Sequence, residues 1–214
     1  MAKKVQILGH VGLRRAHPPR SLGWTETPRR RGSRPSRAMT VRAYAGYEPE
    51  LASGVFVDDT ALVLGQVALG EDASVWPMAV IRGDVHRIEV GPRTNVQDGA
   101  VLHVTHDHPQ VPGGQPLIIG GDVTIGHRAV LHACRVEPVC LIGIGAVIMD
   151  GVVVEEHSLI AAGSLIPPGK RLPAGFLWKG APAQQVRRLD ATEIDYLRYS
   201  AAHYVRLKEG HRQA

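Results

Sequence analysis

The sequence predicts an all-β solenoid, a parallel β-helix built from hexapeptide repeats, followed by a C-terminal α-helix. Aliphatic residues recur every six positions over most of the chain. The 24 glycines and 15 prolines supply many turns, and only 5% of the residues are aromatic. Short strands with frequent turns suit this composition, and a constant period indicates stacked repeats. Near the end of the chain the apolar spacing becomes helical.

The six-residue spacing extends over four blocks between residues 57 and 172. Its members are Val57, Val63, Leu69, Val75, Ile81, Val90, Val96, Leu102, Ile119, Ile125, Leu131, Val136, Ile142, Ile148, Val154, Ile160, Ile166 and Leu172. With three strand-and-turn units in each coil, every one of these side chains points inward and stacks on its counterpart one coil away. The strands of an ordinary sandwich would not keep so constant a period.

Two interruptions of the spacing predict local departures from the coil. The period resets over residues 84–89, where we expect an altered corner. It breaks again over residues 104–116, which contain Pro109, Pro112, Gly113 and Gly114. We expect this stretch to leave the coil as a loop beside His103, and such loops commonly carry function.

The last segment has the signals of a helix. Asp190 and Glu193 match a capping box, which marks a helix start. One apolar face follows, formed by Ile194, Leu197, Ala201 and Tyr204. We expect a helix of about five turns packed along the solenoid. Lys208 and Arg212 suit its C-terminal dipole.

These patterns divide the chain into a basic extension (1–38), a β-helix domain (39–188) and a helical segment (189–214). The extension holds ten of the 25 Lys and Arg residues and one of the 20 acidic residues, so the rest of the chain is mildly acidic. The domain itself therefore gives no indication of nucleic-acid binding. The extension is a disordered tail, an organellar transit peptide, or translated upstream sequence before a start at Met39.

Two further compositional features bear on location. No run of residues approaches the ~18 consecutive apolar positions of a membrane span. Cys134 and Cys140 have no CxxC spacing, so we expect neither a disulfide nor a thiolate metal site. A cytoplasmic protein is expected, or a mitochondrial or other organellar one if residues 1–38 are a transit peptide.

Three histidines in the repeat region predict a metal site. His103 and His132 each follow an inward leucine, so both should project outward from the same face of neighbouring coils. His127 lies at a corner and faces elsewhere. Three histidines that leave one position open are typical of catalytic zinc. Because one protomer can hardly direct all three at one ion, we expect a site shared across a closed interface, with His127 supplied by the neighbouring chain.

Polar residues near these histidines suggest supporting roles. Arg82 and Asp84 suit an interface clamp, because a guanidinium binds both oxygens of a carboxylate; the alternative is a pair of solvated charges. Gln97 is placed to orient a metal-bound water, and Asp98 to hold a histidine tautomer. His106 in the loop is a weaker candidate for a proton shuttle.

Several segments together closely resemble the γ-class carbonic anhydrase family over residues 39–214. They are Ile81-Arg82-Gly83-Asp84, Asn95-Val96-Gln97-Asp98-Gly99-Ala100-Val101-Leu102-His103, Gly126-His127 and Leu131-His132. The resemblance implies a left-handed β-helix and a homotrimer with three interfacial metal sites. It implies Zn²⁺, or alternatively Fe²⁺ or Co²⁺, as the ion.

The same resemblance implies the roles of individual residues. His103, His127 and His132 are the metal ligands, and Arg82 and Asp84 form intersubunit contacts. Gln97 orients a metal-bound hydroxide, and Tyr204 approaches the site from the C-terminal helix. The implied reaction is the reversible hydration of CO2 to bicarbonate by that hydroxide.

The chain departs from the well-studied members at three positions. Val85 and His106 stand where those enzymes carry glutamates, and Arg206 stands where they carry an asparagine. These differences bear on proton export and not on metal binding. Two alternatives therefore stay open: a hexapeptide-repeat acyltransferase or a thioesterase acting on CoA esters, and a trimeric assembly protein that binds metal without catalysis.

Overall fold

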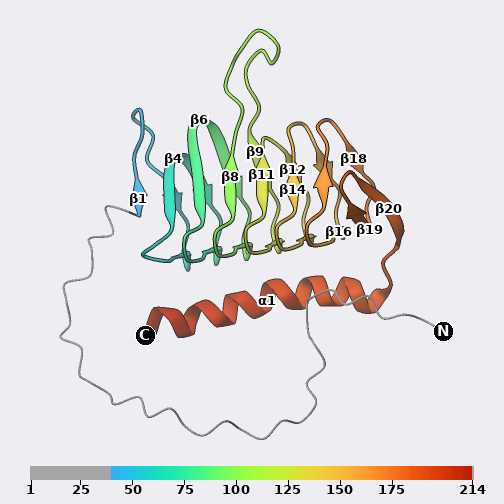
Figure 1. Ribbon diagram of the computed structural model, residues 1–214. Helices are drawn as coiled ribbons and strands as arrows, with labels where there is room; N and C mark the ends of the chain where they lie inside the picture. The colour runs from blue at the N-terminus through green and yellow to red at the C-terminus, as the bar shows by residue number, and fades with distance from the viewer. Residues whose placement is uncertain (1–39, 214) are drawn as a thin grey trace, which may run out of the picture. The chain divides into compact units, whose positions relative to one another are not determined.

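The computed structural model describes residues 40–213, which form a parallel β-solenoid and a long C-terminal helix (Figure 1). Each complete coil contributes three strand positions, so the solenoid has three faces. The fold predicted from the repeat is confirmed. The basic extension, residues 1–38, lies outside the described residues, and the expectations for it stay predictions.

The helix-covered face is the sheet against which the helix packs. Its strands in spatial order are β3 (Phe56–Val57), β5 (Ser74–Val75), β7 (Asn95–Val96), β10 (Thr124–Ile125), β13 (Leu141–Ile142), β16 (Leu159–Ile160) and β19 (Phe176–Gly180). β20 (Ala183–Arg188) pairs antiparallel with β19 and ends the sheet, a hairpin that the six-residue spacing did not predict.

The other two faces share one sheet, because two long strands turn the corner between them. The histidine face contains β1 (Val41–Arg42), the first halves of β4 (Leu62–Leu69) and β6 (Val80–Val90), β8 (Val101–His103), β11 (Val130–His132), β14 (Val147–Ile148) and β17 (Leu165–Ile166). The third face contains β2 (Glu50–Leu51), the second halves of β4 and β6, β9 (Leu117–Ile119), β12 (Arg135–Val136), β15 (Val153–Val154) and β18 (Arg171–Leu172).

The core consists of three stacked columns, one behind each face. On the histidine face, for example, Leu102 stacks on Leu131, Leu131 on Ile148 and Ile148 on Ile166. Seventeen of the eighteen aliphatics predicted to point inward are buried, and Val57 packs against them partly buried. A single short strand cannot bury its apolar side, so the coils depend on one another for stability.

The altered corner expected over residues 84–89 lies within β6. β4 and β6 run side by side around this corner, with a register shift between Gly65 and Val67. Two glycines allow the close approach: a Cβ on Gly65 would lie 2.4 Å from the carbonyl oxygen of Gly83, and Gly65 has a φ of +78°. A side chain at Gly65 would therefore collide with backbone. The strand continues through the altered corner that the change in spacing predicted.

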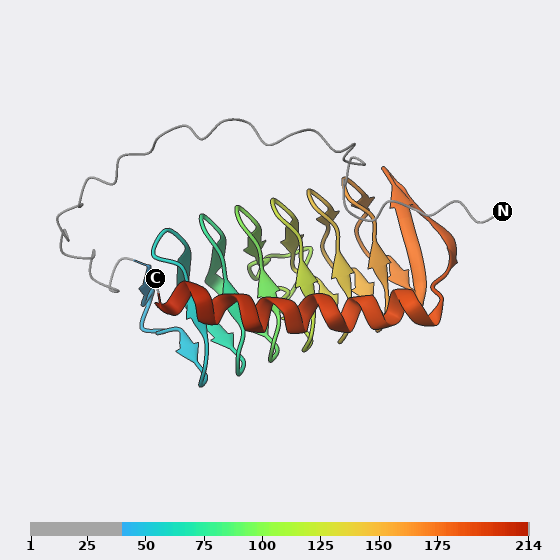
Figure 2. The same ribbon diagram turned by 90° about the horizontal axis from the view of Figure 1, so that it is seen from below.

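The C-terminal helix α1 (Ala191–Gln213) lies along the coils, as seen in Figure 2. The predicted capping box is present: the Glu193 backbone N–H donates to Asp190 Oδ1 at 2.9 Å, and the Asp190 N–H donates to Glu193 Oε2 at 3.1 Å. Leu197 and Ala201 are buried against the solenoid. Within residues 40–213, no helix has the apolar length needed to cross a membrane.

Candidate metal centre

His103 and His132 lie side by side on the histidine face, paired in register on β8 and β11. Their rings approach through His103 Nδ1 and His132 Nε2, which are 3.1 Å apart. Two nitrogens bound to one tetrahedral ion would be about 3.3 Å apart, given metal–nitrogen distances of about 2.05 Å. The pair therefore has the spacing of two ligands to a common ion.

A carboxylate holds the far nitrogen of each ring. His103 Nε2 lies 3.0 Å from Asp84 Oδ1, and His132 Nδ1 lies 2.7 Å from Asp150 Oδ1. A carboxylate accepts a hydrogen bond, so in the neutral rings those nitrogens carry the protons. The facing nitrogens then both present lone pairs. Two lone pairs at this distance repel each other unless a cation binds both.

The protonation state of His103 also suits a ligand. Burial lowers the pKa of His103 and outweighs the opposing hydrogen bond to Asp84, while the nearby charge of Arg82 lowers it further. The imidazole is therefore neutral at pH 7, which is the form that binds metal ions.

Asp84 is itself held by Arg82, whose guanidinium donates to the second carboxylate oxygen. Burial alone would raise the pKa of Asp84, but the hydrogen bonds from His103 and Arg82 outweigh it and lower the pKa. The two residues predicted as a clamp thus form an ion pair within one chain and extend it to His103. Whether they also contact a neighbouring chain stays a prediction.

Asp150 and Thr105 are site residues that the sequence reasoning missed. The Thr105 hydroxyl donates to Asp150 Oδ2, while the other oxygen binds His132. Burial raises the pKa of Asp150, but the hydrogen bonds from Thr105 and His132 bring it below its usual value. Asp150 comes 18 residues after His132, one full coil of three hexapeptides, and that interval was an available signal.

His127 belongs to a separate group at the corner after β10. Its Nδ1 lies 2.9 Å from Asp98 Oδ2, so this third histidine also has an aspartate on one ring nitrogen. Its backbone N–H donates to Gln97 Oε1 at 3.2 Å, and Gln97 Nε2 donates to Asn95 Oδ1 at 3.0 Å. Gln97 is buried. Gln97 and Asp98 therefore both support His127.

Tyr204 lies on α1, the helix that packs on the sheet containing β7 and β10. Its ring packs edge-on against Trp76, with centroids 5.2 Å apart. Burial raises the pKa of Tyr204, and the charges of Asp98 and Tyr196 raise it further. The phenol therefore stays protonated at neutral pH. Trp76 lies beside Gln97 on the neighbouring coil, because Val75 pairs in register with Val96, so Tyr204 packs close to Gln97. The approach of Tyr204 to a metal ion stays a prediction.

Taken together, the described residues form two half-sites on one chain. His103 and His132 make the first, and His127, with Asp98 and Gln97, makes the second. Within residues 40–213, no three His, Cys, Asp or Glu side chains are grouped so that they hold a metal ion.

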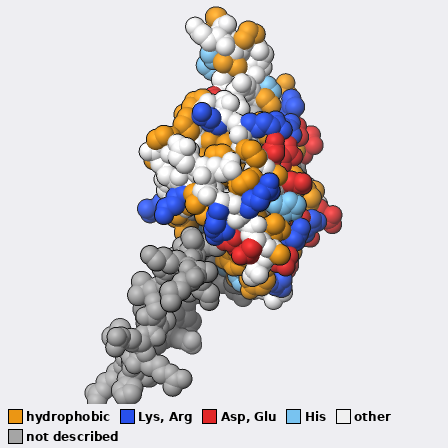
Figure 3. All heavy atoms as spheres, turned by 90° about the vertical axis from the view of Figure 1, so that its right-hand side faces the viewer, with side chains coloured by type: hydrophobic (Ala, Val, Ile, Leu, Met, Phe, Trp, Pro, Cys, Tyr) orange, Lys and Arg blue, Asp and Glu red, His pale blue; other side chains and the backbone are white. Residues whose placement is uncertain are grey.

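The loop over residues 104–116 protrudes from the solenoid between β8 and β9 (Figures 1 and 3). His106 is exposed on it, and its ring centroid lies 5.0 Å from that of His108. The loop is tied to the first half-site at its base through Thr105. The proposed shuttle role of His106 stays a prediction.

The two cysteines do not take part in the site. Cys134 and Cys140 are buried free thiols, as expected. Burial raises the pKa of Cys140 to about 12 and that of Cys134 further still. Both stay protonated at neutral pH, and a thiol in that form does not ligate metal.

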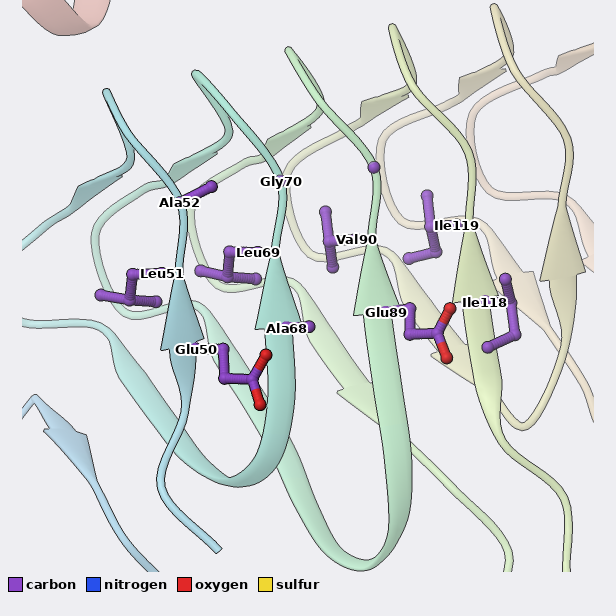
Figure 4. A pocket seen from close by; sticks show the side chains of 11 residues that line it. Glu50, Leu51, Ala52, Ala68, Leu69, Gly70, Glu89, Val90, Ile118 and Ile119 are labelled. Carbon is purple, nitrogen blue, oxygen red and sulfur yellow. The ribbon is translucent and has the colours of Figure 1, made fainter.

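A groove of about 500 Å³ runs along the third face (Figure 4). Glu50 and Glu89 point from its strands, beside small and aliphatic residues that include Ala68 and Ile118. None of its lining residues is a histidine. The groove is therefore separate from both half-sites.

The chain is similar to known proteins over most of its length. No protein-family model matches the chain. Protein YrdA of Escherichia coli is 46% identical over 169 residues, which cover 79% of this chain and 92% of YrdA. Gamma carbonic anhydrase 2, mitochondrial, of Arabidopsis thaliana is 42% identical over 177 residues, which cover 82% of this chain and 63% of the plant protein.

The chain is also similar to an archaeal protein and to a solved structure. The probable carbonic anhydrase of Methanocaldococcus jannaschii is 42% identical, over 74% of this chain and 96% of its own length. The crystal structure of a hexapeptide transferase family protein from Anaplasma phagocytophilum superimposes with a TM-score of 0.74 at 40% identity, covering 80% of this chain and 98% of that one. On this fold, these motifs and these relatives, the chain belongs to the γ-class carbonic anhydrase family of hexapeptide-repeat proteins.

Proposed function

We propose that the protein is a homotrimeric, zinc-dependent carbonic anhydrase that interconverts CO2 and bicarbonate, with Fe²⁺ or Co²⁺ as alternative ions. The observation that carries the proposal is the pair of facing nitrogens on His103 and His132, 3.1 Å apart with their far nitrogens bound to Asp84 and Asp150. Such carboxylate–histidine pairs commonly orient metal ligands. His127 has the same kind of partner in Asp98.

The trimer is supported by an apolar row beside the two histidines. In register along the histidine face lie the outward side chains of Val80, Val101, Val130, Val147 and Leu165. Val101 and Leu165 are 38% and 36% exposed. A contiguous apolar row of this kind marks an association surface. The surface that covers this row belongs to a second copy of the chain, because His127 of that copy would complete the half-site formed by His103 and His132.

Such an interface joins two different surfaces of one protein, so it must close into a ring or grow into a filament. The family resemblance favours a ring of three, with three metal sites. In that ring, His103 and His132 of one protomer meet the neighbouring protomer's corner. Arg82, whose side chain is 42% exposed, is then available to that neighbour through the N–H groups that Asp84 leaves free.

The bound ion supplies one thing: it lowers the pKa of a coordinated water to roughly 7, so that a nucleophile for CO2 exists at neutral pH. The protein side chains do the rest. Asp84, Asp98 and Asp150 hold the three imidazoles in one tautomer each. Gln97 has a second N–H on Nε2 beyond the one given to Asn95, and that group orients the reacting oxygen.

Tyr204 contributes a protonated phenol near Asp98, placed to hydrogen-bond bicarbonate or water. His106, on the exposed loop, is a weaker candidate for carrying protons to solvent. Release of the product requires water to replace bicarbonate. The proposed site lies at the interface between protomers, close to Thr105 at the base of the loop.

The similarity to a hexapeptide transferase structure raises acyl transfer as a second candidate. Acyl transfer needs a catalytic base beside a groove for the acyl carrier. The groove of Figure 4 contains no histidine, and the three histidines lie elsewhere. The geometry therefore favours the anhydrase. A non-catalytic assembly protein is the third candidate, favoured by Val85 and His106.

The test combines metal analysis with stopped-flow CO2 hydration. We expect about one ion per chain in the purified trimer and a loss of bound metal in His103→Ala. Hydration by the wild type should exceed that of His132→Ala by orders of magnitude. Full metal occupancy in His103→Ala would rule out the site. Wild-type rates no better than those of His132→Ala, with metal bound, would favour the assembly protein, and turnover of acyl-CoA would favour the transferase.

A further inference from the structure

Helix α1 carries a set of aromatic and imidazole rings that the proposed function leaves unused. His203 lies edge-on to Tyr204, with ring centroids 5.8 Å apart and an interplanar angle of 81°. On its other side it stacks on Tyr199, at 6.0 Å and 19°. His203 and Tyr199 are exposed, whereas Tyr204 is partly buried against Trp76. The rings thus lead from the solenoid to the surface of the helix.

The inner end of this set lies near the second half-site. Tyr204 packs on Trp76, which lies beside Gln97 on the neighbouring coil because Val75 pairs in register with Val96. Gln97 accepts a hydrogen bond from the backbone N–H of His127, and Asp98 lies 2.9 Å from His127 Nδ1. The second half-site, Tyr204 and His203 therefore follow one another from the candidate metal centre to solvent.

The proposed reaction needs such an outlet. Each hydration converts CO2 and H2O into bicarbonate and one proton, and that proton must leave before the next cycle. Three imidazoles are occupied as ligands, and Asp84, Asp98 and Asp150 are occupied in holding them. Val85 cannot carry a proton. An imidazole is the side chain that most readily takes up and releases protons near neutral pH.

We propose that His203 is the proton-relay residue of this centre, a role that rests on the proposed function. The proton released in hydration passes by way of the Tyr204 hydroxyl and water to the His203 imidazole. His203 then gives it to a buffer base and returns to its neutral form. No other bond changes and no electrons are transferred. The reverse path delivers a proton for bicarbonate dehydration.

The surroundings of His203 suit an exchange with solvent. Its ring neighbours on α1 are Tyr199 and Tyr204. Arg206 lies over the Tyr199 ring, 5.7 Å from its centroid, and Tyr196 lies 6.2 Å from that ring. On the solenoid side, the charge of Asp98 helps to raise the pKa of Tyr204. The described residues include no ion pair to His203, so a proton received there is not trapped by a carboxylate.

Kinetics of His203→Ala provide the first test. In dilute buffer, kcat for CO2 hydration should fall by on the order of 100-fold, because proton transfer becomes limiting. The ratio kcat/KM, which reports the hydration step itself, should stay unchanged. Added imidazole should restore kcat. His108→Ala is the matched control, an imidazole of the loop that should leave both parameters unchanged. A parallel fall of kcat and kcat/KM without rescue would overturn the relay.

His106→Ala separates the two candidate relays. If His106→Ala shows the selective, rescuable loss of kcat and His203→Ala does not, the relay lies on the loop and the present proposal is wrong. A wild-type trimer that binds metal but does not hydrate CO2 would instead overturn the proposed function itself.

NMR gives a readout independent of turnover. The Cε1–H resonance of His203 in the metal-loaded trimer, assigned by its loss in His203→Ala, should shift in Tyr204→Phe, because the phenol hydroxyl is then missing from the path. A His203 resonance that is unchanged in Tyr204→Phe would overturn the relay whatever the activity.

Discussion

His132 Nδ1 lies 2.7 Å from Asp150 Oδ1, and this contact determines which nitrogen of His132 faces His103. The aspartate comes from the coil after that of His132, and Thr105, at the base of the loop after β8, holds its other oxygen. His132, a proposed metal ligand, is thereby oriented by residues from two other parts of the chain. A substitution of Asp150 is therefore as informative as one of His132.

Asp150→Asn should weaken metal binding without removing a ligand. Loss of a carboxylate that orients a ligating histidine typically costs about 10- to 100-fold in metal affinity. Competition with a chelator measures the change. Asp122→Asn, which alters a carboxylate paired with Arg93 on the surface, is the control and should leave the affinity unchanged. An unaltered affinity in Asp150→Asn would contradict the role assigned to this residue.

Val147→Glu should break the trimer and release the metal together. The outward Val147 lies in the apolar row between Val130 and Leu165, so a buried carboxylate there opposes association. Sedimentation velocity and metal analysis measure both effects. The matched control is Val153→Glu, an outward valine of the third face flanked by Arg135 and Arg171. A Val147→Glu trimer with full metal would argue that the row is not the interface.

Glu193→Gln should lower the free energy of unfolding by about 1 kcal/mol at pH 7. The hydrogen bond from Arg187 is the main cause that lowers the pKa of Glu193 below 4.5 in the folded chain. The folded state therefore binds fewer protons than the unfolded state in this range. The stabilisation is complete above pH 4.5 and is lost as the pH falls through the folded pKa.

Denaturant unfolding of the two proteins at several pH values tests this prediction. The difference between wild type and Glu193→Gln should shrink below about pH 4. A difference that persists undiminished at pH 3 would show that the effect comes from packing and not from the charge.

Lys208→Ala should destabilise the protein by about 2 kcal/mol. Lys208 is fully buried, and its Nζ donates to the Gly54 carbonyl and to Asp72 Oδ1, each at 2.7 Å. Removal leaves the carbonyl and the carboxylate without this donor. Arg212→Ala, which removes an exposed cation one turn later, should cost about 0.5 kcal/mol. Equal losses in the two variants, measured by thermal or denaturant unfolding, would contradict this account.

Lys208 also illustrates how far sequence reasoning reached. A lysine near the end of a helix suits the helix dipole, and the sequence alone supported only that interpretation. Its amino group instead joins α1 to the turn at Gly54, 154 residues earlier. Hexapeptide spacing does not reveal such a contact, because the helix and the solenoid follow different periods.

The inward residues were predictable because burial in stacked coils places an aliphatic side chain at every sixth position. The hairpin of β19 and β20 was not predictable from that period, because it ends the repeat. The loop over residues 104–116 was predictable from its prolines and glycines, although its tie to Asp150 was not.

The sequence by itself determined the solenoid, the capped helix and the three histidines with their positions in the repeat. Only the tertiary structure decided that each histidine has its own aspartate. The physical reason is one of scale. Burial of apolar side chains recurs at a fixed spacing along the chain, so the sequence alone reveals it. The contact between a histidine ring nitrogen and a carboxylate oxygen instead depends on distances of 2.7 to 3.0 Å between residues of different segments. That contact exists only once the coils are stacked.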